Sequence, residues 1–229
     1  MKLRSAAAAL MLMLMLAGSA PASAGIISAQ AYLDDTAFAA AVSGLVSLTG
    51  TLPDLGLGGG GTSVTVGDAT LTANNTIFID GRWSTLIPGN EIAISGPENL
   101  NVSVNTDPAT AFGFYFHEPG TSTAIQDGCN TTCVDSTFTI SFYLNNVLVG
   151  STLFAPANDS LIFWGVILDT AFDEVRFVET IGGIDNEFFG EMYVAPIPEP
   201  ATLVLLGTGL AAAGARRRFR RRAESRGCC

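Results

Sequence analysis

The middle of this 229-residue chain almost lacks basic side chains. Between residues 25 and 195, 2 basic residues, Arg82 and Arg176, stand against 19 acidic ones, which gives this span a formal net charge of −17. A surface of this sign repels nucleic acid and anionic lipid, so neither is an expected partner of this part of the chain. It attracts cations, but the same charge also fits plain solubility outside a cell.

Histidine is scarce as well, since His117 is the single one in the chain. Any serine triad would have to use it, and no Gly-x-Ser-x-Gly motif accompanies it. The glycine-rich stretch GLGGGGTS lacks the Gly-Lys-Ser/Thr of a phosphate-binding loop. We expect His117 to lie at a strand end and face solvent, and the sequence indicates no catalytic residue.

Cysteine is limited to four residues, of which Cys129 and Cys133 lie in the turn-forming segment DGCNTTCVD. In an exported chain this spacing is typical of a disulfide that closes a small loop. Such a ring stabilises the fold by about 2 kcal/mol in the chain-entropy model. Zinc is discounted, because it needs about four ligands and the chain has a single histidine.

Long apolar runs occur only near the two ends. Residues 1–24 begin with Lys2 and Arg4, continue through an apolar core, and end in the small-x-small pattern Ala22-Ser23-Ala24. This order predicts a secretory signal peptide that the Sec translocon reads and that is cleaved after Ala24. An uncleaved N-terminal anchor is the alternative, but the apolar core is short for a membrane span.

Residues 25–195 show the pattern of a single acidic all-β domain. Apolar residues alternate with polar ones in about ten short segments separated by turns, which predicts a β-sandwich or jelly roll. Phe112, Phe114 and Phe116 place three rings on one face of a predicted strand. Asn145-Asn146 predicts a tight hairpin turn, because asparagine tolerates positive φ.

One short helix is predicted near the start of the domain, over residues 34–44. Its apolar residues recur at helical spacing, and Asp34, Asp35 or Thr36 can cap its first turn. Gly44 can end it.

The stretch PIPEPATLVLLGTGLAAAGARRRFRRR follows the predicted domain, within residues 196–229. The proline-flanked triplet cannot be helical, whereas the next 15 residues can form an apolar helix of about 22 Å. The arginines should stay on the cytoplasmic side, so the domain faces the opposite side, in agreement with a signal peptide. The residues on which this interpretation depends are Pro198, Glu199, Pro200, Arg216, Arg217 and Arg218.

Over residues 198–222 this arrangement resembles the PEP-CTERM sorting signal of Gram-negative bacteria. The resemblance implies recognition by exosortase, a membrane-embedded cysteine transpeptidase, and cleavage near the Pro-Glu-Pro triplet. It also implies an inner-membrane precursor and a mature protein at the cell surface or in an exopolysaccharide matrix. A plain tail anchor that stays in the inner membrane is the alternative. Residues 163–194 more loosely resemble the end of β-sandwich domains found on such proteins.

The sequence suggests that calcium is bound at a structural site. Asp185 and Asn186 lie in a glycine-rich turn before the last predicted strand, and Asp34 and Asp35 lie near the mature N-terminus. Because domain termini often lie close together, one ion could clip the two ends. The alternative is that Asp34 or Asp35 only caps the helix.

The sequence thus favours a structural or adhesive surface protein, with weak carbohydrate binding, over a secreted glycan-active hydrolase. Trp83, Tyr115, Tyr143 and Trp164 are candidate sugar-stacking rings, although Trp164 fits a core position better. A hydrolase would need a carboxylate pair across a cleft, and the spacing singles out no pair. The carboxylates available for one include Glu118, Asp127, Asp135, Glu174, Asp185 and Glu187.

Overall fold

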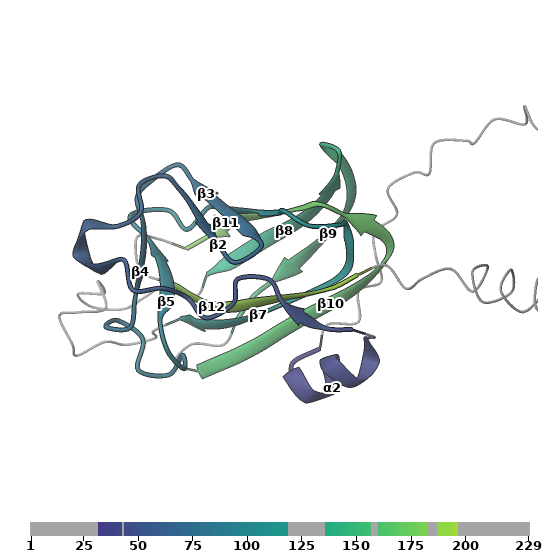
Figure 1. Cartoon of the computed structure of the whole chain (residues 1–229), viewed down its shortest axis with the longest axis horizontal. Coiled ribbons are helices and arrows are strands. Elements are labelled where there is room, and N and C mark those ends of the chain that lie inside the picture. The colour runs from purple at the N-terminus through teal and green to yellow at the C-terminus, as the bar shows by residue number, and fades with distance from the viewer. Residues whose placement is uncertain (1–31, 43, 119–135, 157–159, 183–186, 197–229) are drawn as a thin grey trace, which may run out of the picture.

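The computed structural model describes residues 32–42, 44–118, 136–156, 160–182 and 187–196. Two antiparallel six-stranded sheets, packed face to face, and one short helix make up this part of the chain (Figure 1). The predicted signal peptide, the Cys129–Cys133 pair, Asp185, Asn186 and the sorting triplet lie outside it. Among the described residues, no helix combines the length and apolar character needed to cross a membrane.

Sheet A has the strand order β10-β7-β12-β5-β4, and the two-residue strand β1 pairs with β12. Its strands are β1 (Val46–Ser47), β4 (Ile77–Asp80), β5 (Glu91–Ile94), β7 (Ala109–Glu118), β10 (Ser160–Phe172) and β12 (Phe188–Pro196).

Sheet B has the strand order β2-β3-β6-β11-β8-β9. Its strands are β2 (Ser63–Val66), β3 (Ala69–Ala73), β6 (Leu100–Val104), β8 (Thr137–Leu144), β9 (Val147–Phe154) and β11 (Glu174–Ile181). The turn η1 (Gly56–Gly58) precedes β2. The sequence pattern did not indicate β1 and β3: β1 is too short for a period, and β3 carries mainly alanine and threonine.

The core lies between the sheets and is built largely from phenylalanine rings. Phe114 on β7 meets Phe177 on β11 with ring centroids 5.1 Å apart, and Phe116 meets Phe138 on β8 at 5.6 Å. The predicted inward face of β7 is therefore confirmed. Each ring of this kind contributes about 1.5–3 kcal/mol when fully buried.

The outer face of sheet A is covered by the helix α2 (Asp35–Ala41), which packs against β10. Gly113 and Gly165 are directly opposite each other in the β7–β10 register, and the Phe38 ring fits into the hollow they leave. The helix is shorter than the predicted 34–44, because Val42 already has extended backbone with φ −110° and ψ 148°.

The predicted hairpin turn is confirmed at Asn145 and Asn146, whose φ angles are 51° and 64°. This turn joins β8 to β9, and its backbone is tied to the β10–β11 turn because the Asn145 N–H donates to the Asp173 carboxylate.

At the opposite end of the molecule the chain passes repeatedly from one sheet to the other. Three of these connections, β5 to β6, β7 to β8 and β11 to β12, all leave or enter strands at that end. The last strand, β12, runs away from it and ends at Pro196 beside Gly44.

Candidate functional site

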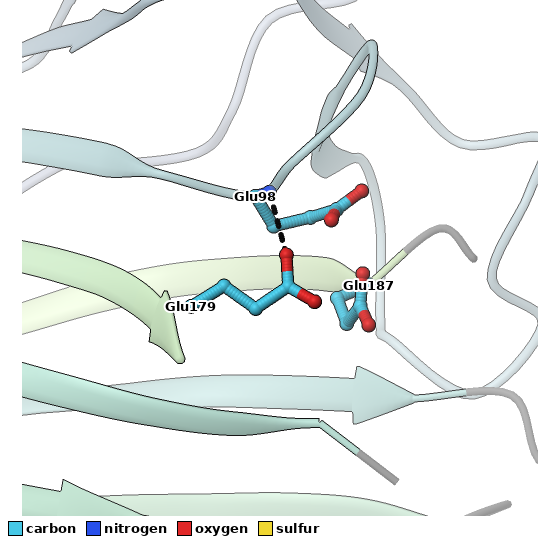
Figure 2. A group of neighbouring side chains, drawn as sticks. All are labelled: Glu98, Glu179 and Glu187. Atoms are coloured by element: carbon cyan, nitrogen blue, oxygen red, sulfur yellow. Dashed lines mark hydrogen bonds between the residues drawn. The ribbon is translucent and has the colours of Figure 1, made fainter. Parts of the chain in front are cut away.

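Three glutamates meet where the chain crosses between the sheets. Glu98 lies in the β5–β6 connection, Glu179 near the end of β11, and Glu187 immediately before β12. One carboxylate oxygen of each lies within 4.8 Å of the others. Figure 2 shows the three side chains coming together from these segments. We call these three residues the glutamate cluster.

The cluster is buried rather than exposed to solvent. Glu98 and Glu187 are fully buried, and Glu179 is half-buried. The backbone N–H of Glu98 donates to Glu179 Oε2 at 3.2 Å, and the hydroxyl of Ser136 donates to Glu187. The N–H of Ser136 also donates to Glu118 Oε1 at 2.6 Å, so the ends of β7, β8 and β12 are joined here.

Electrostatics within the cluster disfavour three ionised carboxylates. Burial raises the pKa of Glu98 far above its ordinary value of 4.5, and the neighbouring Glu187 and Glu179 carboxylates raise it further. The two arginines of the domain are engaged elsewhere: Arg82 pairs with Asp80, and Arg176 pairs with Glu174. No lysine or other arginine occurs between residues 25 and 195 to neutralise the cluster.

A second feature is a groove on the outer face of sheet A, beside α2. Its volume is about 290 Å³. The residues that line it are Asp35, Thr36, Ala39, Leu45, Tyr115, Phe163 and Tyr193. We call it the tyrosine groove.

Both tyrosines of the groove are held by carboxylates. The Tyr115 hydroxyl donates to Asp35 Oδ2 at 2.5 Å, and the Tyr193 hydroxyl donates to Glu191 Oε2 at 2.7 Å. Burial, followed by the bond to Asp35, raises the pKa of Tyr115 to about 12. The Tyr115 bond in turn lowers the pKa of Asp35. At neutral pH the groove therefore presents neutral phenol groups beside the ionised carboxylate of Asp35.

The expectation that His117 faces solvent is wrong. Its side chain lies on the outer face of sheet A, but the β4–β5 loop folds over it and leaves it 8% exposed. The hydroxyl oxygen of Ser84, from that loop, lies 2.9 Å from His117 Nδ1. Because the Ser84 hydroxyl also accepts from the N–H groups of Leu86 and Ile87, this buried pair fixes the loop.

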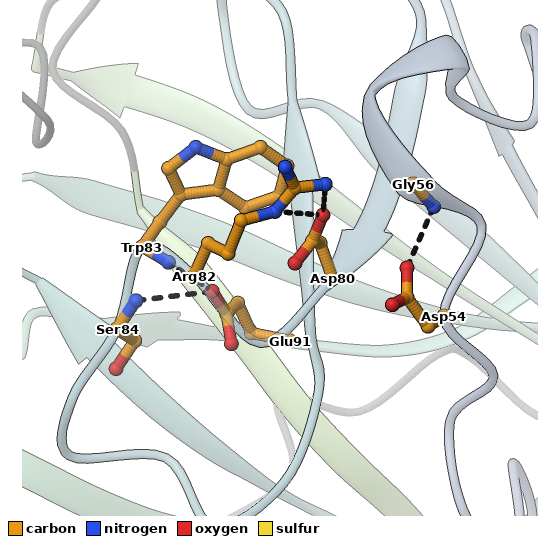
Figure 3. Close-up of polar contacts among 7 residues, drawn as sticks. All are labelled: Asp54, Gly56, Asp80, Arg82, Trp83, Ser84 and Glu91. Atoms are coloured by element: carbon orange, nitrogen blue, oxygen red, sulfur yellow. Dashed lines mark hydrogen bonds and ion pairs between the residues drawn. The ribbon is translucent and has the colours of Figure 1, made fainter.

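The same loop carries Arg82 and Trp83, which lie between β4 and β5. Figure 3 shows Glu91 Oε1 accepting from the backbone N–H groups of Trp83 and Ser84, at 2.7 and 3.0 Å. The Trp83 ring packs edge-on against Phe78 at 5.9 Å. The first turn of the loop is therefore anchored by the buried Glu91 and the half-buried Phe78.

Other predicted stacking rings have structural neighbours. Trp164 is 3% exposed and packs on Phe114 in the core, as expected. Tyr143 lies under the Arg176 guanidinium, 4.0 Å from the ring centroid. Tyr115 is the predicted ring that the structure places in the groove.

The predicted calcium ligands are only partly described. Asp34 caps α2, since its carboxylate accepts from the Ala37 N–H at 2.7 Å, and Asp35 accepts from Tyr115. Asp185 and Asn186 lie outside the described residues. Calcium binding by this set of four therefore stays a prediction.

Glu98 and Glu179 were missed as site residues, although Glu179 gave a signal. On β11, Val175 and Phe177 face the core, and Glu179 is the next residue in this alternation. An acidic residue therefore occupies a position where the pattern requires an apolar one. Glu98 had no such signal, because it lies in an irregular connection. Glu187 was noted only as one of many carboxylates.

The structure thus defines an acidic protein of two packed antiparallel sheets, with a buried glutamate cluster at one end and an aromatic groove on one face. The family model of the PEP-CTERM protein-sorting motif matches residues 196–218. The match confirms the resemblance: the chain carries a PEP-CTERM sorting signal, which implies export and processing by exosortase. No curated protein matches the sequence significantly.

The solved structures that match this chain share little sequence with it. A family 29 carbohydrate-binding module is 11% identical, covering 69% of this chain and 99% of its own, with a TM-score of 0.37. The K2 cleaved adhesin domain of Lys-gingipain is 11% identical, covering 60% and 93%, with a TM-score of 0.41. The family 22 carbohydrate-binding module of Clostridium thermocellum Xyn10B is 13% identical, covering 58% and 87%, with a TM-score of 0.35. We draw no functional conclusion from likeness at this level.

Proposed function

We propose that this chain is the precursor of a structural or adhesive protein of the cell surface or exopolysaccharide matrix, released from its membrane segment by exosortase. One observation carries the proposal. The sorting motif begins at Pro196, which is also the last residue of β12. Cleavage near the Pro-Glu-Pro triplet would therefore remove only chain beyond the last strand and leave both sheets complete.

The tyrosine groove is the surface that we assign to glycan binding in this role. The rings of Tyr115, Tyr193 and Phe163 offer apolar area for the C–H face of a sugar. The phenol hydroxyls and the Asp35 carboxylate lie at the groove, where the Tyr193 hydroxyl donates to Glu191, and these groups suit sugar hydroxyls as hydrogen-bond partners. A concave apolar site with a few placed polar groups is the usual form of a small-ligand site.

Binding of the full-length chain to exopolysaccharide from the bacterium that produces it tests this assignment. We expect Tyr193→Ala to weaken binding roughly tenfold or more, because a buried stacking ring contributes upward of about 1.4 kcal/mol. Tyr193→Phe should retain most of the affinity, since the ring remains. The measurement is affinity electrophoresis in gels containing the polysaccharide.

Tyr143→Ala is the matched control, because this tyrosine lies on sheet B and outside the groove. It should bind like the unaltered chain. Equal losses for Tyr143→Ala and Tyr193→Ala, or no loss for Tyr193→Ala, would contradict the assignment of the groove.

The glutamate cluster does not favour the alternative of a glycan-active hydrolase. A retaining pair of carboxyl groups lies about 5–5.5 Å apart and an inverting pair about 6.5–9.5 Å apart, with the sugar between them. In the cluster one oxygen of each carboxylate lies within 4.8 Å of the others, and Glu98 and Glu187 are fully buried. A polysaccharide cannot pass between them.

A further inference from the structure

We propose that Glu98, Glu179 and Glu187 bind one calcium ion, which neutralises the cluster and ties together the connections between the two sheets at this end of the molecule. This site is separate from the tyrosine groove and does not depend on glycan binding. It also differs from the four ligands that the sequence suggested, Asp34, Asp35, Asp185 and Asn186.

The first observation is the state of Glu98. Its side chain is fully buried, and among the described residues neither of its carboxylate oxygens has a hydrogen-bond donor. One of these oxygens lies within 4.8 Å of a carboxylate oxygen of Glu179 and of Glu187, and the three side chains meet here (Figure 2). A buried carboxylate without a donor loses the hydration of its charge and gains nothing in return, unless a cation or a proton compensates it.

The second observation is that the domain has no lysine, and no arginine without a carboxylate partner, to provide that compensation. Residues 25–195 contain two arginines and no lysine, and both arginines already pair with carboxylates beside them on their own segments. The remaining candidates are protons and a bound metal ion. The net charge of −17 over this span raises the local concentration of cations in either case.

The chemistry of the donors favours calcium. Carboxylate oxygens are hard ligands that suit calcium and magnesium, whereas zinc sites are built mainly from thiolates and imidazoles. Calcium binds oxygen at about 2.3–2.6 Å, so two ligands on opposite sides of one ion lie about 5 Å apart. The spacing of the cluster, within 4.8 Å, accommodates that geometry.

The burial of the glutamate cluster favours calcium over magnesium. Magnesium keeps several of its waters and is seldom enclosed by protein ligands alone, whereas calcium exchanges its waters for carboxylates readily. Glu98 and Glu187 are fully buried, which leaves little room for a retained hydration shell. A protein outside the cell also meets calcium at concentrations that suit dissociation constants of about 0.1–1 mM.

The position of the ligands gives the ion a structural role. Glu98 belongs to the β5–β6 connection, Glu179 to β11, and Glu187 to the chain that enters β12. β12 and β5 belong to sheet A, whereas β6 and β11 belong to sheet B. One ion held by all three would therefore fasten the two sheets to each other at this end.

Thermal unfolding of the full-length chain in mild detergent tests the proposal at pH 7. In 10 mM calcium we expect the midpoint to lie about 4–8 °C above its value in chelator, from mass action on the folded state. The same concentration of magnesium should produce less than half of this shift. No calcium shift, or an equal shift with magnesium, would overturn the proposal.

Glu98→Gln locates the ion, because glutamine keeps the shape of the side chain and removes its charge. We expect the variant to bind calcium at least tenfold more weakly, while its midpoint in chelator is unchanged or higher. Glu179→Gln, at a half-buried position, should lose the response in the same way. Glu174→Gln, on the same strand but paired with Arg176, is the control and should keep the full calcium shift.

A full calcium shift in both Glu98→Gln and Glu179→Gln would place the ion elsewhere and contradict the proposal. Should one variant fail to fold, the other variant still tests where the ion binds, and the absence of a calcium shift in the unaltered chain would still contradict the proposal.

Discussion

At the scale of single residues, two glycines decide how closely α2 approaches sheet A. A Cβ atom added at Gly165 would lie 2.7 Å from Cδ2 of the Phe38 ring, and one at Gly113 would lie 2.9 Å from Cε1 of the same ring. Phe38 is fully buried in this hollow. Gly113 alternates with the inward Phe112 and Phe114, which gives it an outward position, but this pattern could not reveal that the Phe38 ring from a distant segment needs the space.

We therefore expect Gly165→Ala to lower the free energy of unfolding by about 1–3 kcal/mol, the usual cost of overpacking a filled site. Denaturant unfolding followed by tryptophan fluorescence measures the change. Gly58→Ala is the control, since nothing lies within 4 Å of its added Cβ. Similar stabilities for Gly165→Ala and the unaltered chain would show that the helix does not depend on this contact.

At the scale of elements, alternating patterns in the sequence predicted most of the strands. The glutamate cluster was not predicted, because Glu98 and Glu187 lie in connections between strands, where no such pattern exists. Alternation gave the inward face of β7 correctly, and paired asparagines gave the β8–β9 turn. The prediction for His117 was wrong because the β4–β5 loop covers this side chain on the outer face of the sheet. The sequence of the strand itself does not indicate which loop will cover it. The glutamate cluster assembles from separate segments, so its members become neighbours only in the folded chain.

The cluster also predicts how the free energy of unfolding depends on pH when calcium is absent. Glu98, Glu179 and Glu187 face one another there, Glu118 joins through Ser136, and His117 on β7 pairs with Phe188, the residue after Glu187. Because the pKa of Glu98 is raised above 4.5, the folded state holds a proton that the unfolded chain releases.

In chelator, the contribution of the cluster to the free energy of unfolding should therefore be fully present below about pH 4.5 and fall as the pH rises above it. The slope is about 1.4 kcal/mol per pH unit for each retained proton. Denaturant titrations between pH 5 and 8 measure it. Glu98→Gln should flatten the profile and calcium should oppose the fall, whereas identical slopes for the variant and the unaltered chain would refute this origin.

At the scale of the whole molecule, charge and topology fit a protein built for release. The acidic span between residues 25 and 195 ends where the basic sorting segment begins, so processing would separate the two kinds of charge. The PEP-CTERM motif could be recognised from sequence because its elements are contiguous. The groove and the cluster could not, because they depend on how distant segments pack.

Mass spectrometry of the mature protein recovered from the cell surface or medium tests the central claim most directly. We predict an N-terminus at Gly25 and a C-terminus at or near the Pro-Glu-Pro triplet, with no peptide containing Arg216, Arg217 or Arg218. The strand β12 should be intact in that product. Recovery of released protein that still carries the arginine-rich C-terminal peptide would contradict the account.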